Sequence, residues 1–286
     1  MARAPWQRSR GVDAVLDRWR HDDAIRRDLA LDRTLDPTEP DAVPLPADLP
    51  EAVRAGLRAR GITSLYRHQS EALDLARAGR HLVVATPTAS GKSLCFSLPL
   101  AERLAAEPGA RALALLPTKA LARDQEHSLG ALFHASGLDA VVATYDGDTN
   151  ADARRRARER ANVIITNPDM LHGGMLPHHA SWSRFFSSLR FVIVDELHAL
   201  TGVFGSHVAN VLRRLRRIAR FHGSDPVFLC ASATLGNPGA HAARMIGAPV
   251  VTIDRSGAPV GPRNVVVYNP PIINPELGVR ASYTRS

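Results

Sequence analysis

Residues 81–93 read HLVVATPTASGKS, and this stretch decides the fold class. Residues 81–85 predict a buried strand, and the residues from Leu94 onward predict a helix. Between the two, residues 86–93 have the spacing of a phosphate-binding loop, although Thr86 replaces the first glycine. A turn without a ligand is the structural alternative, but the order strand, loop, helix is the one that a phosphate loop requires. We therefore predict a phosphate site in an α/β fold.

Each residue type in this loop suits a nucleoside triphosphate bound with Mg²⁺. Small residues, with Gly91 at the closest approach, let successive backbone N–H groups surround the β-phosphate. Lys92 supplies a mobile charge for the β- and γ-phosphates, and the Ser93 hydroxyl is a ligand for Mg²⁺. Only Lys92 and Lys119 are lysines among the 36 lysines and arginines, which indicates a need for a compact ammonium at both positions. The predicted cofactor-binding residues of the loop are Thr86, Pro87, Thr88, Ala89, Ser90, Gly91, Lys92 and Ser93.

Two acidic residues follow another apolar run, residues 191–194. Asp195 and Glu196 would lie at the carboxyl end of a buried strand, where carboxylates are costly unless a cation or water meets them. In phosphate-loop motors such an Asp holds Mg²⁺ through water, and the neighbouring Glu polarises the attacking water. A helix N-cap at Asp195 is the alternative, which the phosphate loop upstream disfavours. We assign catalysis to Lys92, Asp195, Glu196 and His198, and the metal to Ser93 and Asp195, with His198 linking the site to a second lobe or to the γ-phosphate.

Valine-rich apolar runs alternate with helical patterns from about Glu51 onward. Continuous apolar runs indicate strands buried on both faces, as in a parallel sheet, and helices between them give right-handed crossovers in an α/β sandwich. Residues 1–50 are polar and punctuated by prolines, and they predict an N-terminal extension with a charged helix at 11–27. The predicted strands are residues 81–86, 112–116, 140–144, 163–166, 191–194, 227–231 and 264–268.

The composition favours a cytosolic globular protein. Of the 286 residues, 45% are hydrophobic and 22% charged, yet no apolar run approaches the ~20 residues of a membrane helix. Cys95 and Cys230 lie far apart in apolar segments, which predicts reduced core thiols and excludes a zinc knuckle built from this chain alone. The net charge of +8 is compatible with a polyanionic partner. The arginine clusters at 154–160 and 213–220 are nevertheless more typical of solvated helix faces.

In this order, the motifs resemble the first motor lobe of superfamily 2 DEAD/DEAH-box helicases over roughly residues 57–270. Residues 65–69, LYRHQ, look like the segment that reads adenine, where a glutamine amide both donates to and accepts from the base. Residues 116–125, LPTKALARDQ, and 166–171, TNPDML, resemble the blocks that contact the backbone of a single strand. Residues 232–234, SAT, resemble the block that couples nucleotide state to the strand. The resemblance implies base contacts from Tyr66 and Gln69, nucleic-acid contacts from Thr118, Lys119, Thr166 and Asp169, and coupling through Ser232, Ala233 and Thr234.

The resemblance also implies a domain plan. A RecA-like phosphate-loop sandwich with a mostly parallel sheet would occupy residues 51–262, between the extension at 1–50 and the start of a linker at 263–286. Its cofactors would be ATP and Mg²⁺. In the family, a second RecA-like lobe of the same protein supplies arginine fingers, and no segment after residue 234 resembles that lobe. We therefore expect this chain alone to bind ATP but to hydrolyse it very slowly.

Residues 145–149, 167–172 and 195–215 most resemble the bacterial mitomycin repair factor helicases, which are distant relatives of RecQ-type enzymes. This resemblance implies 3′→5′ unwinding, with single-stranded or partly duplex DNA as partner, in lesion repair at the nucleoid of the bacterial cytoplasm and not at a membrane. Ala89 stands where many members have glycine, Ser93 where many have threonine, and the subfamily's C-terminal cysteine cluster is missing. Two alternatives stay open: an RNA helicase lobe, which shares every block, and a non-catalytic nucleotide-gated scaffold, against which the intact Lys92 and Glu196 argue.

Overall fold

The computed structural model describes residues 11–233 and 235–281. The chain divides into two compact units. The larger comprises Pro40–Ala258, and the smaller comprises Met1–Glu39 together with Pro259–Ser286. The predicted site residues all fall in the larger unit, although Thr234 lies outside the described residues.

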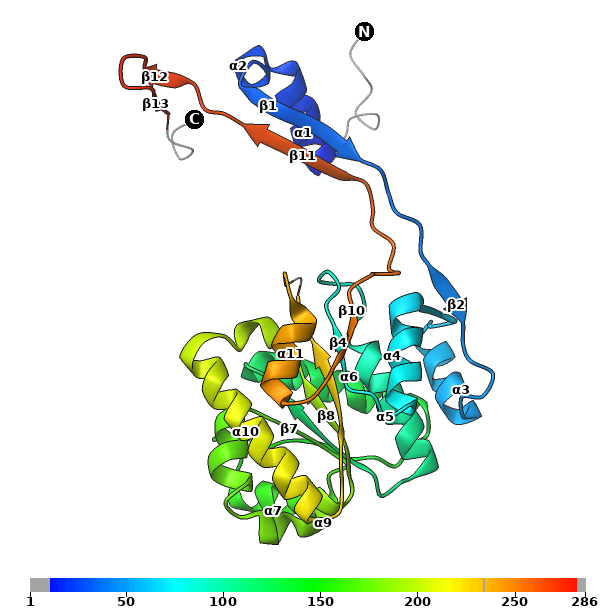
Figure 1. The fold of residues 1–286 in the computed structure, drawn as a ribbon. Helices are drawn as coiled ribbons and strands as arrows, with labels where there is room; N and C mark the ends of the chain where they lie inside the picture. The colour runs from blue at the N-terminus through cyan, green and yellow to red at the C-terminus, as the bar shows by residue number, and fades with distance from the viewer. Residues whose placement is uncertain (1–10, 234, 282–286) are drawn as a thin grey trace. The chain divides into compact units, whose positions relative to one another are not determined.

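A seven-stranded sheet forms the centre of the larger unit (Figure 1), and each pair of neighbouring strands is parallel. The spatial order is β10-β4-β9-β8-β5-β7-β6. The predicted apolar runs became strands, whereas β10, which has three residues, was not predicted. The strands are β4 (Leu82–Val84), β5 (Arg111–Leu115), β6 (Val142–Thr144), β7 (Val163–Thr166), β8 (Leu189–Val194), β9 (Val227–Ala231) and β10 (Val251–Ile253).

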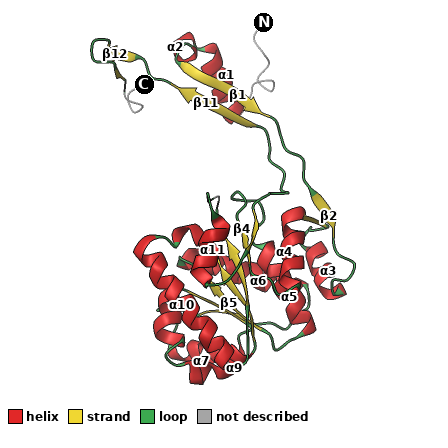
Figure 2. Ribbon diagram, in the orientation of Figure 1, coloured by secondary structure: helices red, strands yellow, loops and turns green. Residues whose placement is uncertain are grey.

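Helices cover both faces of this sheet (Figure 2). One face carries α3 (Glu51–Ala59), α4 (Arg67–Arg77), α5 (Leu94–Ala106) and α6 (Lys119–Ala135). The other carries α7 (Ala151–Arg160), α9 (Ser183–Ser187), α10 (Gly202–Phe221) and α11 (Pro238–Ile246). Because successive strand residues point to opposite faces, Leu82 and Val84 join the core with the first helix set, and Val83 joins the core with the second. Two apolar cores therefore sandwich the sheet, which confirms the predicted RecA-like α/β fold.

Shorter elements complete the larger unit. Strand β2 (Ala42–Pro44) pairs antiparallel with β3 (Ser64–Tyr66), so residues of the predicted extension pack with the lobe, as does the buried Leu49. A brief helix, α8 (Pro168–Met170), continues into the π-helical turn η2 (Leu171–Met175). The 3-10 turns are η3 (His179–Trp182) and η4 (Leu197–Ala199).

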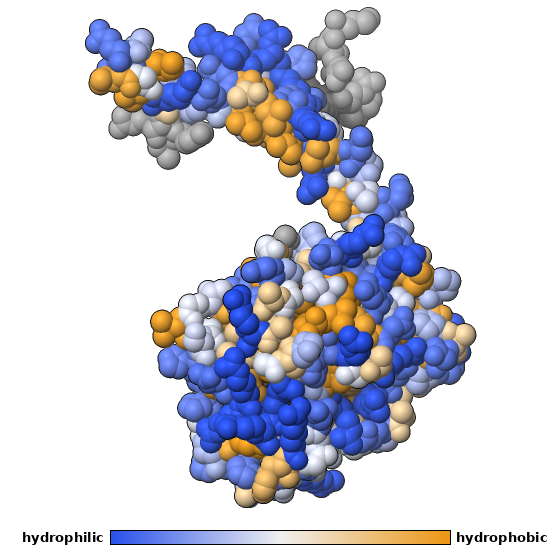
Figure 3. All heavy atoms as spheres, in the orientation of Figure 1, coloured by the Kyte–Doolittle hydropathy of each residue, from blue (hydrophilic) through white to orange (hydrophobic). Residues whose placement is uncertain are grey.

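In the smaller unit, the helix predicted over 11–27 is broken into α1 (Val12–His21) and α2 (Asp23–Arg26). Asp22 causes the break, because its backbone is extended and its side chain accepts a hydrogen bond from the Ala24 N–H. Strand β1 (Leu29–Leu35), which was not predicted, pairs antiparallel with the predicted β11 (Arg263–Tyr268), and β12 (Ile272–Asn274) pairs with β13 (Val279–Arg280). Leu31 and Val267 are exposed on this ribbon, where Figure 3 shows an apolar patch.

The arginine-rich face of α10 forms part of a hydrophilic surface (Figure 3). Two of its arginines have structural partners, because Arg213 donates to the Arg244 carbonyl (3.0 Å), and Arg216 donates to the carbonyls of Ile246 (2.9 Å) and Gly247 (2.8 Å). These carbonyls lie at the end of α11, where a helix leaves its last acceptors free. None of the helices in the described ranges has the length and apolarity required to span a membrane.

Candidate functional site

The phosphate loop joins β4 to α5 and is bent in a way that only small residues allow. Gly91 has φ 82° and Ala89 has φ 62°, both in the left-handed region. Inside the bend, the Thr86 and Ser90 hydroxyls share a hydrogen bond of 2.7 Å, and both residues are buried. Lys92 Nζ donates to the carbonyls of Thr86 and Pro87, at 2.9 Å each. The ammonium is therefore held over the loop by two backbone carbonyls.

The acidic strand end lies on the same edge of the sheet. Asp195 directly follows β8, and its carboxylate accepts a hydrogen bond from the Glu196 N–H (2.8 Å). Burial raises the pKa of Asp195, and the nearby positive charge of Lys92 partly opposes that rise. Glu196 has φ 52°, a strained conformation for a non-glycine residue of the kind that clusters at functional sites. The structure thus brings a lysine and two carboxylates, predicted from separate motifs, to one place.

Ser93 is the N-cap residue of α5 and lies beside α6. Gln125 of α6 donates to the Ser93 hydroxyl at 3.4 Å, a contact that sequence reasoning missed because the two residues are far apart in the chain. Oxygen ligands of this kind, a hydroxyl and a carboxylate, suit Mg²⁺, which takes few protein ligands and keeps phosphates and waters. No cluster of three or more His, Cys, Asp or Glu side chains able to hold a metal occurs among the described residues.

His198 connects the acidic strand end to the segment after β9. Its Nδ1 atom is 3.2 Å from the Ala233 N and also 3.2 Å from a Glu196 carboxylate oxygen. One ring nitrogen cannot accept from an N–H and donate to a carboxylate at once, so only one of the two contacts is a hydrogen bond in a given tautomer. Ser232 is buried, and its N–H donates to the Val84 carbonyl (2.9 Å) of the phosphate-loop strand. Of the predicted coupling residues, Ser232 and Ala233 therefore contact the site, and Thr234 is not described.

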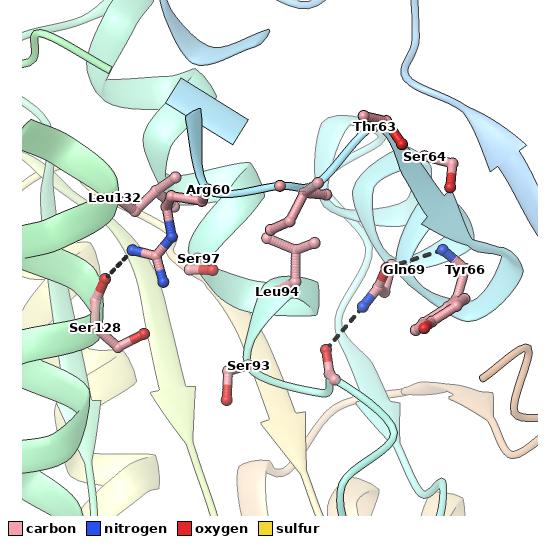
Figure 4. A pocket seen from close by; sticks show the side chains of 13 residues that line it. Arg60, Thr63, Ser64, Tyr66, Gln69, Ser93, Leu94, Ser97, Ser128 and Leu132 are labelled. Carbon is pink, nitrogen blue, oxygen red and sulfur yellow. Dashed lines mark hydrogen bonds between the residues drawn. The ribbon is translucent and has the colours of Figure 1, made fainter. Parts of the chain in front are cut away.

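A cavity of about 350 Å³ lies beside the phosphate loop, between residues 60–69 and the helices α5 and α6. In Figure 4, Gln69 and Tyr66 lie on one side of it, and Arg60 and Ser128 on the other. Gln69 accepts from the Tyr66 N–H (2.9 Å) and donates to the Gly91 carbonyl (3.0 Å), which leaves one amide hydrogen and one lone pair for a ligand. The lining residues are Arg60, Gly61, Ile62, Thr63, Ser64, Tyr66, Gln69, Gly91, Ser93, Leu94, Ser97, Ser128 and Leu132.

The predicted nucleic-acid residues separate into exposed and buried groups. Thr118 caps α6 by accepting from the Leu121 N–H (3.3 Å), and Lys119, in the first turn, forms an ion pair with Asp148. Thr118, Lys119 and Asp169 are exposed. Thr166, in contrast, is buried and donates its hydroxyl to the Tyr145 carbonyl (2.6 Å), so its side chain holds the loop that follows β6 and does not reach the surface.

The comparisons with known proteins agree with this geometry. The sequence pattern described as "DEAD/DEAH box helicase" matches residues 66–241. The chain is 47% identical over 250 residues to the "Uncharacterized ATP-dependent helicase YprA" of Bacillus subtilis, a match that covers 87% of this chain and 33% of YprA. Two crystal structures of the "DUF1998 helicase MrfA", one bound to DNA and one bound to DNA and AMPPNP, superimpose with TM-scores of 0.89. Their sequences are 43% and 42% identical to this chain. Each match covers 96% of this chain, but only 36% and 37% of the respective MrfA chains. The chain thus spans about a third of the length of these relatives.

Proposed function

The chain belongs to the DEAD/DEAH box helicases, and from that premise we propose that it is the nucleotide-binding lobe of an ATP-dependent DNA helicase. The observation that carries this proposal is the meeting of Lys92, Asp195 and Glu196 on one edge of the sheet, next to the cavity at Gln69. A phosphate loop alone binds phosphate, whereas a water-activating carboxylate beside it is needed for hydrolysis.

ATP would bind with its base in the cavity and its phosphates on residues 88–93. Gln69 has one free donor and one free acceptor position, which matches the N7 acceptor and the N6 donor of adenine and opposes the O6 acceptor of guanine. The Ser93 hydroxyl and the Asp195 carboxylate, directly or through water, would hold Mg²⁺, which neutralises phosphate charge when bound. A related structure, MrfA bound to DNA and AMPPNP, supports ATP as the ligand.

The chain's own residues supply most of the hydrolytic machinery. Glu196 would accept a proton from the attacking water, and Lys92 would leave its two loop carbonyls to stabilise charge on the β- and γ-phosphates. His198 would exchange its contact between Glu196 and Ala233, which links the water-activating group to the predicted coupling block. A second RecA-like lobe would complete the site with arginine fingers, an effect worth about 10³–10⁵ in rate in related NTPases.

Single-stranded DNA would cross the loops at the amino ends of α6 and α8, held through its backbone by Thr118, Lys119 and the N–H groups near Asp169. The MrfA structures bound to DNA support DNA as the substrate over RNA. Unwinding in the 3′→5′ direction, a role in DNA repair and work at the bacterial nucleoid belong to the same proposal and rest on the family resemblance.

The test compares binding with hydrolysis. The 286-residue chain should bind ATP–Mg²⁺, and a protein that also carries the second lobe should hydrolyse ATP when single-stranded DNA is added. Glu196→Gln should abolish that hydrolysis, while Glu71→Gln, an exposed glutamate on α4, should not change it. Unchanged turnover in Glu196→Gln would favour the scaffold alternative, and equal stimulation by matched RNA would favour an RNA helicase. Robust DNA-stimulated hydrolysis by the 286-residue chain as a monomer would disprove the need for a second lobe.

A further inference from the structure

His68 is buried in the first turn of α4, and its ring bridges two distant segments of backbone. Its Nε2 lies 3.0 Å from the carbonyl oxygen of Ser90 in the phosphate loop, and its Nδ1 accepts a hydrogen bond from the Gly257 N–H (3.1 Å). A backbone N–H can only donate, so Nδ1 carries no proton and Nε2 donates to Ser90. Burial also lowers the pKa of His68, which keeps the ring neutral. The imidazole is therefore fixed in one tautomer by two backbone partners.

The Gly257 side of this bridge is the point where the chain leaves the larger unit. The Asp41 N–H donates to the Gly257 carbonyl (2.9 Å), and the Arg67 N–H donates to the Asp41 carbonyl (2.8 Å). A Cβ atom at Gly257 would lie 2.5 Å from the Asp41 oxygen and 2.9 Å from the Arg67 nitrogen, so only glycine allows this approach. The boundary between the two compact units falls at Glu39/Pro40 and at Ala258/Pro259. Both chain crossings are thus hydrogen-bonded to the segment that carries His68.

The Ser90 side of the bridge belongs to a loop that must rearrange around phosphate. Lys92 has to leave the carbonyls of Thr86 and Pro87, and the N–H groups of the loop have to turn toward the ligand. The Ser90 hydroxyl is tied to Thr86 and its carbonyl to His68, so a change in the loop acts on the imidazole. Because the ring is rigid, a shift at Nε2 moves Nδ1 as well.

We propose that His68 is a positioning residue that couples nucleotide occupancy of the phosphate loop to the two points where the chain crosses between the compact units. The proposal rests on the proposed function in that ATP–Mg²⁺ is the ligand of the loop. A ring that only filled space would need burial alone, whereas this ring uses both nitrogens, one on the phosphate loop and one on the Gly257 segment. It adds a side-chain link beyond the pairing of β4 with β10 and the hydrogen bond from the Ala85 N–H to the Ile253 carbonyl.

The first experiment uses the wild-type 286-residue chain. Hydrogen–deuterium exchange is measured with and without ATP–Mg²⁺ for peptides spanning 254–260 and 38–42. Fixing the loop should slow exchange of the Gly257 N–H by roughly two- to tenfold, the range that corresponds to one net hydrogen bond. ATP binding without any change in these peptides would overturn the coupling alone. Failure to bind ATP–Mg²⁺ would overturn the proposed function and the coupling together.

Two substitutions separate the two ends of the bridge. His68→Gln retains a donor near Nε2 but loses the acceptor for Gly257, and His68→Asn retains the acceptor but loses the donor to Ser90. In His68→Gln, we expect exchange of 254–260 to be fast and insensitive to ATP, with ATP affinity within about twofold of wild type. In His68→Asn, exchange without nucleotide should stay slow, and ATP affinity should fall roughly two- to tenfold.

The matched control is His81→Asn, because His81 also accepts a backbone N–H, that of Phe228, at the opposite end of β4. It should alter neither ATP affinity nor exchange at 254–260. If both His68 variants keep the wild-type response to ATP, or if both lose ATP affinity equally, His68 is only structural and the proposal is wrong. Should a variant fail to fold, the wild-type exchange measurement still decides.

Discussion

Gly91→Ala should damage the nucleotide site through both backbone strain and a steric clash. Gly91 has φ 82°, where an L-residue costs about 1–2 kcal/mol. A Cβ atom there would lie 2.6 Å from Gln69 Nε2, so the Gln69 side chain must move. Moving it breaks the hydrogen bonds to the Gly91 carbonyl and from the Tyr66 N–H. Each is worth about 0.5–1.5 kcal/mol, so the free energy of unfolding should fall by about 2–5 kcal/mol in total.

The assay is thermal unfolding of the 286-residue chain together with ATP titration. A loss of about 2 kcal/mol corresponds to a fall in Tm of roughly 4–8 °C for a domain of this size. ATP affinity should fall by at least about tenfold, equivalent to about 1.4 kcal/mol, because Gln69 leaves the cavity and the loop N–H groups are displaced.

Ala89→Gly is the matched control, because Ala89 already has φ 62° in the same loop. Relief of left-handed strain, worth about 1–2 kcal/mol, is largely offset by the entropy of a new glycine, about 0.5–1 kcal/mol. Its Tm should therefore stay within about 2 °C of wild type or rise slightly. If Gly91→Ala melted and bound ATP like wild type, the cavity beside Gln69 would not be shaped by this contact, and our assignment of it to the base would fail.

Three further predictions follow from the charges. Burial raises the pKa of Asp195, so Mg²⁺-dependent ATP affinity should decline on acidification at a higher pH than for an ordinary aspartate. Without Mg²⁺, stability should rise as the pH falls through that pKa, and Asp195→Asn should remove both effects in titrations of ATP affinity and of Tm. Asp148→Asn should strengthen single-stranded DNA binding a few-fold in fluorescence anisotropy, because it frees Lys119 from its ion pair. Asp152→Asn, which breaks the ion pair with Arg155, should leave DNA binding unchanged. Arg216→Ala should lower the free energy of unfolding by about 1–2 kcal/mol in denaturant titrations, because two carbonyls at the end of α11 lose their donor, and the exposed Arg217→Ala should be neutral.

The sequence predicts the site best at positions where the chemistry requires one particular residue type. The spacing of Gly91 and Lys92 after a valine-rich run predicts the loop, and the Asp195-Glu196 pair predicts the acidic strand end. A parallel sheet brings the carboxyl ends of its strands to one edge, so both predictions meet without knowledge of the strand order. The role of each residue toward ATP and DNA stays a prediction until the binding measurements are made.

Contacts between distant segments were not predictable in the same way. His68 and Gly257 are 189 positions apart, and Lys119 and Asp148 are 29 apart, so no local periodicity relates them. Strand β1 was missed because it is largely exposed, so it lacks an apolar run, and it forms by pairing with β11, which lies at the other end of the chain. Such contacts arise from topology, which a single sequence encodes only through the whole packing arrangement.

Buried threonines near the strand ends hold the loops in place, whereas the exposed residues of those loops are the ones proposed to bind ligands. Thr86, two residues after β4, and Thr166, the last residue of β7, are buried, and their hydroxyls form hydrogen bonds with the Ser90 hydroxyl and the Tyr145 carbonyl. Each buried hydroxyl needs a hydrogen-bond partner, and here that partner lies in the loop that it ties down. The next residues along the chain lie beyond the sheet, where the proposed ligands would bind. At this edge of the sheet, the buried Thr166 therefore supports the proposed DNA face, while the exposed Thr118 and Lys119 can contact it.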